Sequence, residues 1–310
     1  MLKFLKYLSS LLLFILVLVF LYHQYSLNKE KKLLTSSIGQ RVEVDGKRMS
    51  VYVAGNGPKT LVFLSGSGTS SPILDFKSLY SKLVKDYRVV VVEKFGYGFS
   101  DDWSNHRDLD TILSQTRKAL QKADVKGPYV LLPHSMSGLE AMHWSASYPK
   151  EVEAIIGLDM SLSQAFDKYR ANRLLYKTLQ FAANLGLSRL LYSPDKEIRS
   201  LSNGSLNPKE KSIYKALFYR YPLSNAVIKE AEEVKSNAKL VKQDKVTAIP
   251  YLLFVSNGQG TGFARKDWQD MSKDFAKDHK NVQLKSFDVP HYIHSYIPDE
   301  LTKEIRKFLK

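Results

Sequence analysis

The chain has 310 residues, of which 46 are lysine or arginine and 31 are aspartate or glutamate, so its formal net charge is +15. It contains no cysteine, which excludes a disulfide scaffold, a thiolate nucleophile and cysteine-ligated zinc or iron–sulfur sites. The length suits one large domain or two ordinary ones with a sizeable core. The positive charge is compatible with nucleic acid, an anionic membrane surface or an anionic wall polymer as a partner.

The beginning of the chain is apolar enough for a membrane-spanning helix. Residues 7–28 carry no charged side chain, and their centre, 11–22, is entirely aliphatic or aromatic. A helix needs about 20 such residues to cross a bilayer. No small-x-small cleavage site follows the apolar run, so we predict an uncleaved anchor over residues 1–32. The alternative, a buried core helix, is disfavoured because the segment has no polar face.

The charges beside this segment are nearly balanced. Lys3 and Lys6 precede it and three lysines follow it by residue 32, so the positive-inside rule barely discriminates. A short N-terminal tail usually stays inside, which favours a single-pass anchor with an extracytoplasmic domain. Residues 1–32 contribute five lysines and one glutamate, which leaves 41 basic and 30 acidic residues, or +11. Beside a membrane, this charge favours anionic lipid or wall polymer over nucleic acid as a partner.

After the anchor, short apolar runs alternate with helical periods. Residues 42–46 and 49–53 predict a hairpin around an Asp-Gly turn. Runs without polar alternation are typical of strands that are buried on both faces, as in a parallel sheet. Six such runs follow, at 60–64, 88–92, 129–132, 154–158, 251–255 and 282–287.

Helical periods lie between these runs. Residues 109–120 carry an apolar stripe behind Asp108 or Asp110 as the N-cap, and a last helix begins at Pro298. The alternation predicts an α/β sheet with helices on both faces. Residues 161–245 contain no strand-like run, which indicates a helical insertion between two strands.

The segment Leu-Leu-Pro-His-Ser-Met-Ser-Gly at 131–138 lies between a predicted strand and a predicted helix. This is the context of a nucleophile elbow, a strained turn that exposes a serine hydroxyl, here that of Ser135. The positions two residues before and after the serine, usually glycine, hold the compact residues Pro133 and Ser137. The alternative interpretation is a serine-rich helix cap.

Three further segments give the chain a resemblance to the α/β-hydrolase superfamily over residues 39–310. Leu-Ser-Gly-Ser-Gly at 64–68 resembles its oxyanion loop, Phe-Gly-Tyr-Gly-Phe-Ser-Asp at 95–101 its turn after strand four, and Pro-His-Tyr-Ile-His at 290–294 its histidine loop. The resemblance implies an α/β-hydrolase domain over residues 33–310, with a mostly parallel eight-stranded sheet and helices on both faces. It also implies a helical cap, residues 161–245, after strand six.

Within this resemblance, Ser135 is the nucleophile and His291 is the base that a serine hydroxyl requires. His291 is preferred to His294 because its two neighbours match the family pattern. A His-x-x-His metal site formed by this pair would lack an obvious third ligand, so neither metal nor cofactor is expected. The backbone N–H groups of Ser67 and Met136 are the expected oxyanion donors.

The acid of the triad is the least regular member. Most of the superfamily places it after strand seven, where this chain has Gln259, and an amide cannot stabilise an imidazolium as a carboxylate can. Asp159 follows the strand-six run, a topological point that pancreatic-type lipases use, and it keeps the chain order Ser…Asp…His. We predict Asp159; the alternative is that it only caps the first turn of the insertion.

The sequence thus predicts a membrane-anchored serine hydrolase that cleaves a small-molecule acyl ester or amide, most closely of carboxylesterase or lipase type (EC 3.1.1). One alternative is an aminopeptidase of proline-iminopeptidase type, in which Glu230, Glu232 and Glu233 would bind the substrate ammonium. An acyltransferase and a catalytically inactive surface binding protein also remain open. The altered elbow and the missing strand-seven acid are the best support for the inactive protein. The retained Ser135–His291 pair and the intact glycines of the oxyanion loop argue against it.

Overall fold

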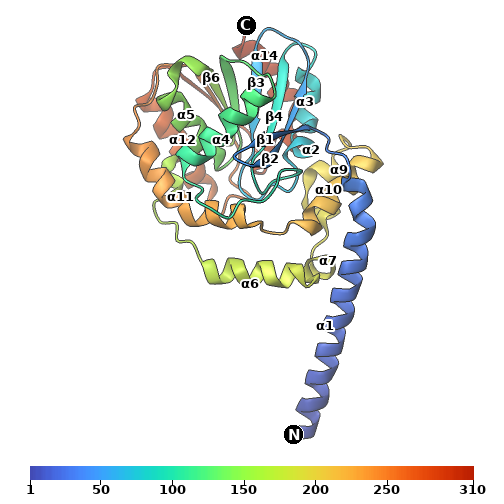
Figure 1. Ribbon diagram of the computed structural model, residues 1–310. Helices are drawn as coiled ribbons and strands as arrows, with labels where there is room; N and C mark the ends of the chain where they lie inside the picture. Colours follow the sequence, from blue (N-terminus) through green and yellow to red (C-terminus); the bar gives the residue numbers. More distant parts are fainter.

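The computed structural model describes residues 1–310 and contains one eight-stranded sheet between layers of helices (Figure 1). The strand order is β1-β2-β4-β3-β5-β6-β7-β8. Strand β2 is antiparallel to both of its neighbours, and the other pairs are parallel. The strands are β1 Gln40–Val44, β2 Lys47–Ala54, β3 Thr60–Leu64, β4 Arg88–Glu93, β5 Tyr129–Pro133, β6 Val152–Leu158, β7 Tyr251–Val255 and β8 Val282–Ser286.

The central strands lack polar alternation because both of their faces are buried. Along β4, Val90 and Val92 belong to one hydrophobic core, whereas Val89 and Val91 belong to the other. The larger core lies under α4 Leu109–Lys122, α5 Ser137–Ser147 and α12 Arg265–Asp278, and the smaller under α2 Pro72–Asp75, α3 Lys77–Leu83, α13 Ile293–Tyr296 and α14 Pro298–Phe308.

Helix α4 begins where its capping residue predicts. The side chain of Asp108 accepts a hydrogen bond from the backbone N–H of Thr111 at 2.8 Å, so Asp108 rather than Asp110 is the N-cap. Asp110 instead stands in the first turn and contacts His143.

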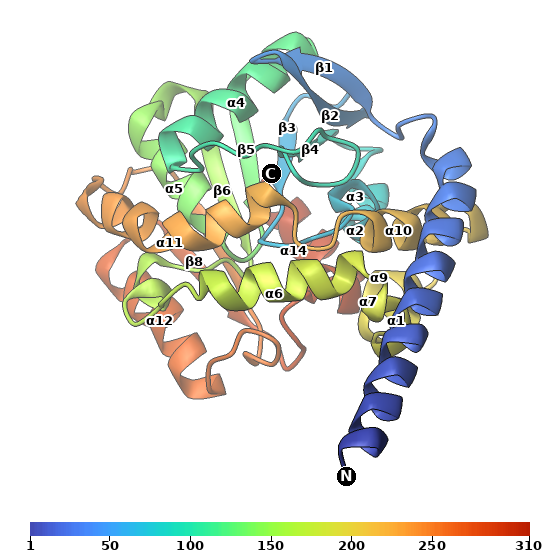
Figure 2. The same ribbon diagram turned by 60° about the horizontal axis from the view of Figure 1, so that its bottom comes forward.

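The chain between β6 and β7 forms helices only. We call residues 161–245 the cap. Its longest helix, α11, buries eight side chains, whereas α6 buries none. Figure 2 shows α6 crossing the front of the domain in that view. The cap helices are η3 Ser163–Phe166, α6 Arg173–Asn184, α7 Leu187–Leu191, α8 Pro194–Glu197, α9 Arg199–Ser202, α10 Pro208–Arg220 and α11 Asn225–Gln243.

Helix α1, Leu2–Glu30, projects away from the domain and continues into the short helix η1, Lys31–Leu34 (Figure 1). Only His23 is buried along α1, so the helix is not a core element of the domain. It is long and apolar enough to cross a membrane. Its C-terminal part touches the cap, where the guanidinium of Arg189 donates to Glu30 at 2.6 and 2.8 Å and to Nδ1 of His23 at 2.9 Å.

Candidate active site

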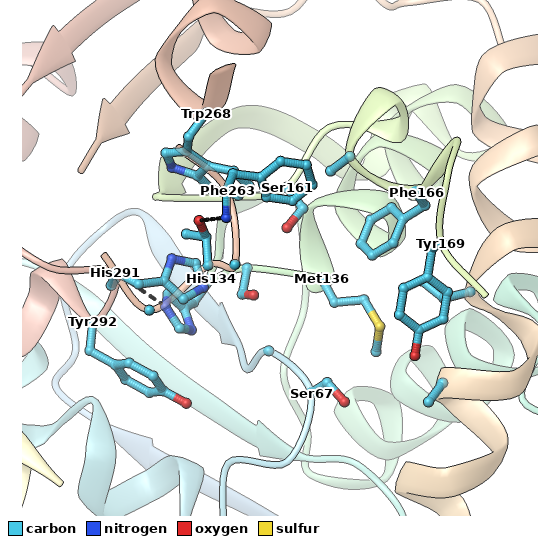
Figure 3. A pocket seen from close by; sticks show the side chains of 18 of the residues that line it. Ser67, His134, Met136, Ser161, Phe166, Tyr169, Phe263, Trp268, His291 and Tyr292 are labelled. Carbon is cyan, nitrogen blue, oxygen red and sulfur yellow. Dashed lines mark hydrogen bonds between the residues drawn. The ribbon is translucent and has the colours of Figure 1, made fainter. Parts of the chain in front are cut away.

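A cavity of about 540 Å³ lies beneath the cap, and four of the five predicted site residues line it. These four are Ser67, Ser135, Met136 and His291. Figure 3 shows Ser67, Met136 and His291 around the cavity, with Phe166 and Tyr169 on the side opposite His291. The fifth, Asp159, lies behind His291 and is 1% exposed.

The turn that carries Ser135 has the backbone geometry of an elbow. Ser135 follows β5, precedes α5 and has a φ of 54°, in the left-handed region that non-glycine residues rarely adopt. A Cβ atom on Gly66 would lie 2.6 Å from the Cβ of Ser135, and one on Gly138 would lie 2.4 Å from the carbonyl oxygen of Ser161. The close approaches in this turn therefore fall on Gly66 and Gly138 rather than on the two usual glycine positions.

The residues at those two usual positions support the turn in other ways. Pro133 ends β5 opposite Leu64, and the next residue, His134, donates its backbone N–H to the carbonyl of Leu64 at 2.9 Å. The hydroxyl of Ser137 is 2.7 Å from this carbonyl and 2.8 Å from that of His134. The Ser137 hydroxyl and the His134 N–H thus hold the elbow against β3, the strand that leads into the predicted oxyanion loop, while Pro133 ends the pairing of β5 with that strand.

His291 is held by Asp159. Its Nδ1 lies 2.5 Å from one carboxylate oxygen of Asp159. The other oxygen accepts from the backbone N–H of Ser256 at 2.7 Å and from the indole N–H of Trp268 at 2.9 Å. A carboxylate can only accept, so Nδ1 of His291 carries a hydrogen, and Nε2 is the nitrogen that can accept a proton when the ring is neutral.

No hydrogen bond joins Ser135 to His291 in the unliganded structure. Such bonds are often long before substrate binds and tighten in the complex. Both side chains line one cavity, so a molecule bound there can contact both.

Gln259, at the position where the family usually has its acid, contributes through its backbone. Its carbonyl oxygen accepts from the N–H of His291 at 2.9 Å. The histidine loop is therefore held by the strand-seven loop through the main chain, while the carboxylate comes from the end of β6.

The two predicted oxyanion donors are free to bind a ligand. Neither the N–H of Ser67 nor that of Met136 donates to an acceptor within the chain. Unpaired N–H groups that face a cavity can stabilise negative charge on a carbonyl oxygen in the transition state.

His134, which precedes Ser135, is a structural histidine. Its Nε2 lies 3.2 Å from the carbonyl oxygen of His291, which can only accept, so Nε2 carries the hydrogen. Burial and the neighbouring His291 and His294 hold the pKa of His134 well below its usual range. The ring is therefore neutral and supports the main chain of the histidine loop.

His294 has a separate carboxylate partner and does not line the cavity. Its Nε2 lies 2.9 Å from Asp75, whose other oxygen accepts from the hydroxyls of Ser200 at 3.0 Å and Tyr214 at 3.3 Å. His294 and Asp75 are 0% and 1% exposed. The structure thus separates the two candidate bases, and only His291 has access to Ser135.

The three cap glutamates all have partners within the protein. Burial alone would raise the pKa of Glu230, but Lys94, Arg107 and the hydroxyl of Tyr97 hold it below its usual value. Arg107 pairs with Glu230 at 2.5 Å, and the backbone N–H of Arg107 donates to Glu233 at 2.8 Å. Glu232 contacts Arg173 and Lys229.

No carboxylate side chain lines the cavity, and its only charged lining residue apart from the histidines is Lys168. No group of three or more His, Asp or Glu side chains is arranged to hold a metal ion.

Two contacts of the site were missed from the sequence. Trp268 lies on the inner face of α12, a helix that we did not predict, and Ser256 follows β7. The only signal for Trp268 is an aromatic residue near the start of an amphipathic stretch at 265–278. Such a residue is typical of core packing and does not indicate a hydrogen bond to a particular carboxylate.

The alpha/beta hydrolase fold family matches residues 59–227. The chain belongs to the α/β-hydrolase fold family. It is 36% identical to the uncharacterized protein YbdG of Bacillus subtilis (strain 168), over an alignment that covers 98% of this chain and 95% of that protein. The predicted fold class and superfamily are confirmed.

Solved structures show the same architecture. An epoxide hydrolase from Vigna radiata superposes with a TM-score of 0.65 at 16% identity, covering 87% of this chain and 96% of that one. A probable hydrolytic enzyme from Pseudomonas aeruginosa PAO1 gives 0.60 at 16% identity, covering 89% and 96%. Identities this low establish the fold alone. Together with the family match, these neighbours support a hydrolase.

Proposed function

We propose that the protein is a serine hydrolase that cleaves a carboxylic ester through an acyl-enzyme. The Oγ of Ser135 attacks the ester carbonyl while Nε2 of His291 takes the hydroxyl proton. The N–H groups of Ser67 and Met136 stabilise the oxyanion, and Asp159 stabilises the imidazolium. Collapse of the tetrahedral intermediate breaks the bond to the alkoxide, which leaves with the proton from His291. Water repeats the sequence, releasing the acid and restoring Ser135.

The observation that carries this proposal is the bond between Nδ1 of His291 and Asp159, in a site where Ser135 lines the same cavity. A buried carboxylate that accepts three hydrogen bonds can hold the imidazole in the tautomer needed by a general base. An inactive binding protein would not require this arrangement beside a serine that lines a cavity.

The elbow residue argues against the chemistry named for the epoxide hydrolase neighbours. Related folds with that activity use a carboxylate nucleophile, whose alkyl ester water can hydrolyse. The hydroxyl of Ser135 would give a stable ether with an epoxide, whereas with an ester carbonyl it gives a hydrolysable acyl-enzyme.

The cavity also disfavours an aminopeptidase. A substrate ammonium needs a buried anionic partner, and the three cap glutamates are all occupied by internal donors. The lining is aromatic, aliphatic and hydroxyl-bearing, which suits a neutral ester.

We further propose that α1 spans a membrane and holds the catalytic domain at its extracytoplasmic surface. The aromatic side chains of Tyr22 and Tyr25 are both 58% exposed near the end of the apolar stretch, as in the aromatic belts of membrane helices.

The decisive experiment is covalent labelling of the full-length protein by a fluorophosphonate probe. Labelling should occur in the wild type and disappear in Ser135→Ala, while Ser147→Ala, the same change at the exposed end of α5, should retain it. Failure of the folded wild type to label would favour the inactive binding protein.

Hydrolysis of short and long acyl esters, compared with aminoacyl amides, would then define the substrate class. Competition between water and added alcohol acceptors would separate a hydrolase from an acyltransferase. Preference for aminoacyl amides would contradict the ester proposal.

A further inference from the structure

The outer face of α6 and α7 exposes an unusual number of large apolar side chains. The two helices and Tyr192 after them form an amphipathic strap, residues 173–192, of which α6 crosses the front of the domain in Figure 2. Leu191 is 82% exposed and Leu174 79%; single exposed leucines are ordinary, but a group of them on neighbouring helices marks an interaction surface. The other exposed members of this face are Leu175 48%, Leu179 47%, Phe181 65% and Leu190 59%.

This apolar face lies beside α1. A Cβ atom on Gly186, at the start of α7, would lie 2.6 Å from the Cβ of His23 and 3.3 Å from the carbonyl oxygen of Val19. Figure 1 shows α6 running crosswise to α1, which continues past it toward the N-terminus. The strap therefore meets α1 at the level of residues 19–23.

That level is where a bilayer around α1 would end. At about 1.5 Å per residue, the helix from Lys3 to Tyr22 is about 30 Å long, which is the thickness of the hydrocarbon core. The polar contacts with the cap, through His23 and Glu30, begin directly after Tyr22. A membrane held by α1 would thus have its headgroup region at the height of α6 and α7.

The charges of the strap match an anionic membrane surface. Between Asp167 and Asp195 the chain contains five basic residues and no acidic one. Amphipathic helices with an apolar face and flanking lysine or arginine lie in the headgroup region of anionic bilayers. The residues that can face lipid headgroups are Lys168, Arg170, Arg173 and Lys177, because the fifth, Arg189, is paired with Glu30 and His23 of α1.

A second cavity, of about 500 Å³, lies behind the strap. Leu179, Leu187, Leu191 and Phe218 are among its predominantly apolar lining, and it reaches residues 68–70 of the predicted oxyanion loop. An acyl chain leaving a bilayer at this height would meet an apolar surface that continues toward the catalytic residues.

We propose that the apolar face of α6 and α7 lies in the headgroup region of the bilayer that α1 spans, so that the active site draws lipophilic esters from this membrane. The inference rests on the proposed membrane span and ester hydrolysis. Burial of this apolar face in lipid accounts for the exposed leucines and for the excess of basic over acidic residues around them. It also places the second cavity next to the membrane.

The test uses nitroxide labels on the full-length protein in vesicles of phosphatidylcholine and phosphatidylglycerol. The chain lacks cysteine, so single variants Leu174→Cys and Leu191→Cys give one label each at an already exposed position. We expect both labels to be more accessible to molecular oxygen than to a water-soluble nickel chelate. Lys122→Cys, at the exposed end of α4, is the matched control and should show the reverse preference.

A label at Leu13→Cys in α1 separates the inference from the anchor proposal. If position 13 lies in lipid while 174 and 191 are as open to the chelate as 122, the anchor stands and the docking surface is overturned. If position 13 also faces water, the anchor itself is wrong. Dipolar broadening between labels at 174 in different copies would assign the face to self-association and overturn lipid as its occupant.

The substrate part of the inference has its own readout. Leu174→Asp, at a position that is 79% exposed and outside the lining of both cavities, should lower hydrolysis of a long-chain ester held in vesicles while leaving hydrolysis of a soluble short-chain ester unchanged. Equal loss on both substrates would overturn the membrane route. Absence of hydrolysis of either ester by the wild type would instead point to failure of the proposed ester hydrolysis.

Discussion

Two histidines three residues apart each pair with a buried aspartate, yet their surroundings differ. His291 meets Asp159 beside a cavity that contains a serine hydroxyl, whereas His294 meets Asp75 in a fully buried site with two hydroxyl donors. The second nitrogen of His294, Nδ1, is buried without a partner. A histidine–carboxylate pair is therefore no evidence for catalysis by itself; access of the second ring nitrogen to a reacting group distinguishes the two.

The difference between the two histidine–aspartate pairs is tested most directly by replacing each aspartate, Asp159 and Asp75, with asparagine. In Asp159→Asn, the amide oxygen can still accept from Ser256 and Trp268, but its NH₂ group favours the wrong tautomer of His291. We expect kcat to fall by about 10³–10⁴-fold, as measured with a chromogenic ester. A near-wild-type rate would remove Asp159 from the triad.

Glu93 is a buried carboxyl group that has no histidine partner, in contrast to Asp159 and Asp75. It should make the free energy of unfolding depend on pH. Burial raises the pKa of Glu93 from its ordinary 4.5 to about 7. The folded state therefore holds a proton that the unfolded state releases, so the free energy of unfolding should fall as pH rises from about 4.5 to about 7. The loss should be on the order of 3 kcal/mol.

Chemical denaturation of the full-length protein in detergent, at a series of pH values, measures this loss. Glu93→Gln should lack this part of the pH dependence, and Glu300→Gln, at an exposed position, should retain it. Parallel profiles for wild type and Glu93→Gln would show that Glu93 does not bind this proton.

Asp75→Asn is the structural counterpart of Asp159→Asn. It weakens the hydrogen bonds to His294, Ser200 and Tyr214, so we expect a loss of about 2 kcal/mol in unfolding free energy. No atom of this cluster touches the cavity, so we expect kcat/KM to stay within about threefold of the wild-type value. A tenfold change would need a change of about 1.4 kcal/mol in the activation free energy. Loss of activity comparable to that of Asp159→Asn, in folded protein, would erase the distinction.

The smallest effect concerns the indole that supports Asp159. Trp268→Phe removes one donor to the carboxylate, worth about 1 kcal/mol, so kcat should fall about fivefold with little change in KM. The matched change Trp144→Phe, which removes an indole bond to Glu151, should leave both unchanged.

Much of this contrast could be predicted from the sequence, because its signals are local. The apolar run and elbow motif placed Ser135, and chain order placed His291 after the last strand. Asp159 was predicted less directly, from its place after the strand-six run and from chain order, because Gln259 stands where the family usually has its acid. Its hydrogen bonds depend on Trp268 and Ser256, which reach it from α12 and from the end of β7. Tertiary contacts of this kind leave no periodicity in the sequence.

The pairing of His294 was equally invisible. Asp75 lies in the short helix α2, more than 200 residues earlier in the chain, and no sequence spacing relates the two. The same holds for the outer face of α6, whose apolar pattern resembles that of a buried helix. Only the arrangement in space shows that its leucines are uncovered.

The contact between Arg189 and α1 also concerns how freely the molecule can turn. A domain joined to its membrane helix by a flexible linker would rotate freely relative to that helix. Here α1 continues directly into η1, and Leu33 and Leu34 pack beside α10. In addition, the guanidinium of Arg189 donates hydrogen bonds to Glu30. These contacts therefore fix the orientation of the domain relative to α1. The same side of the cap then faces the N-terminal part of α1.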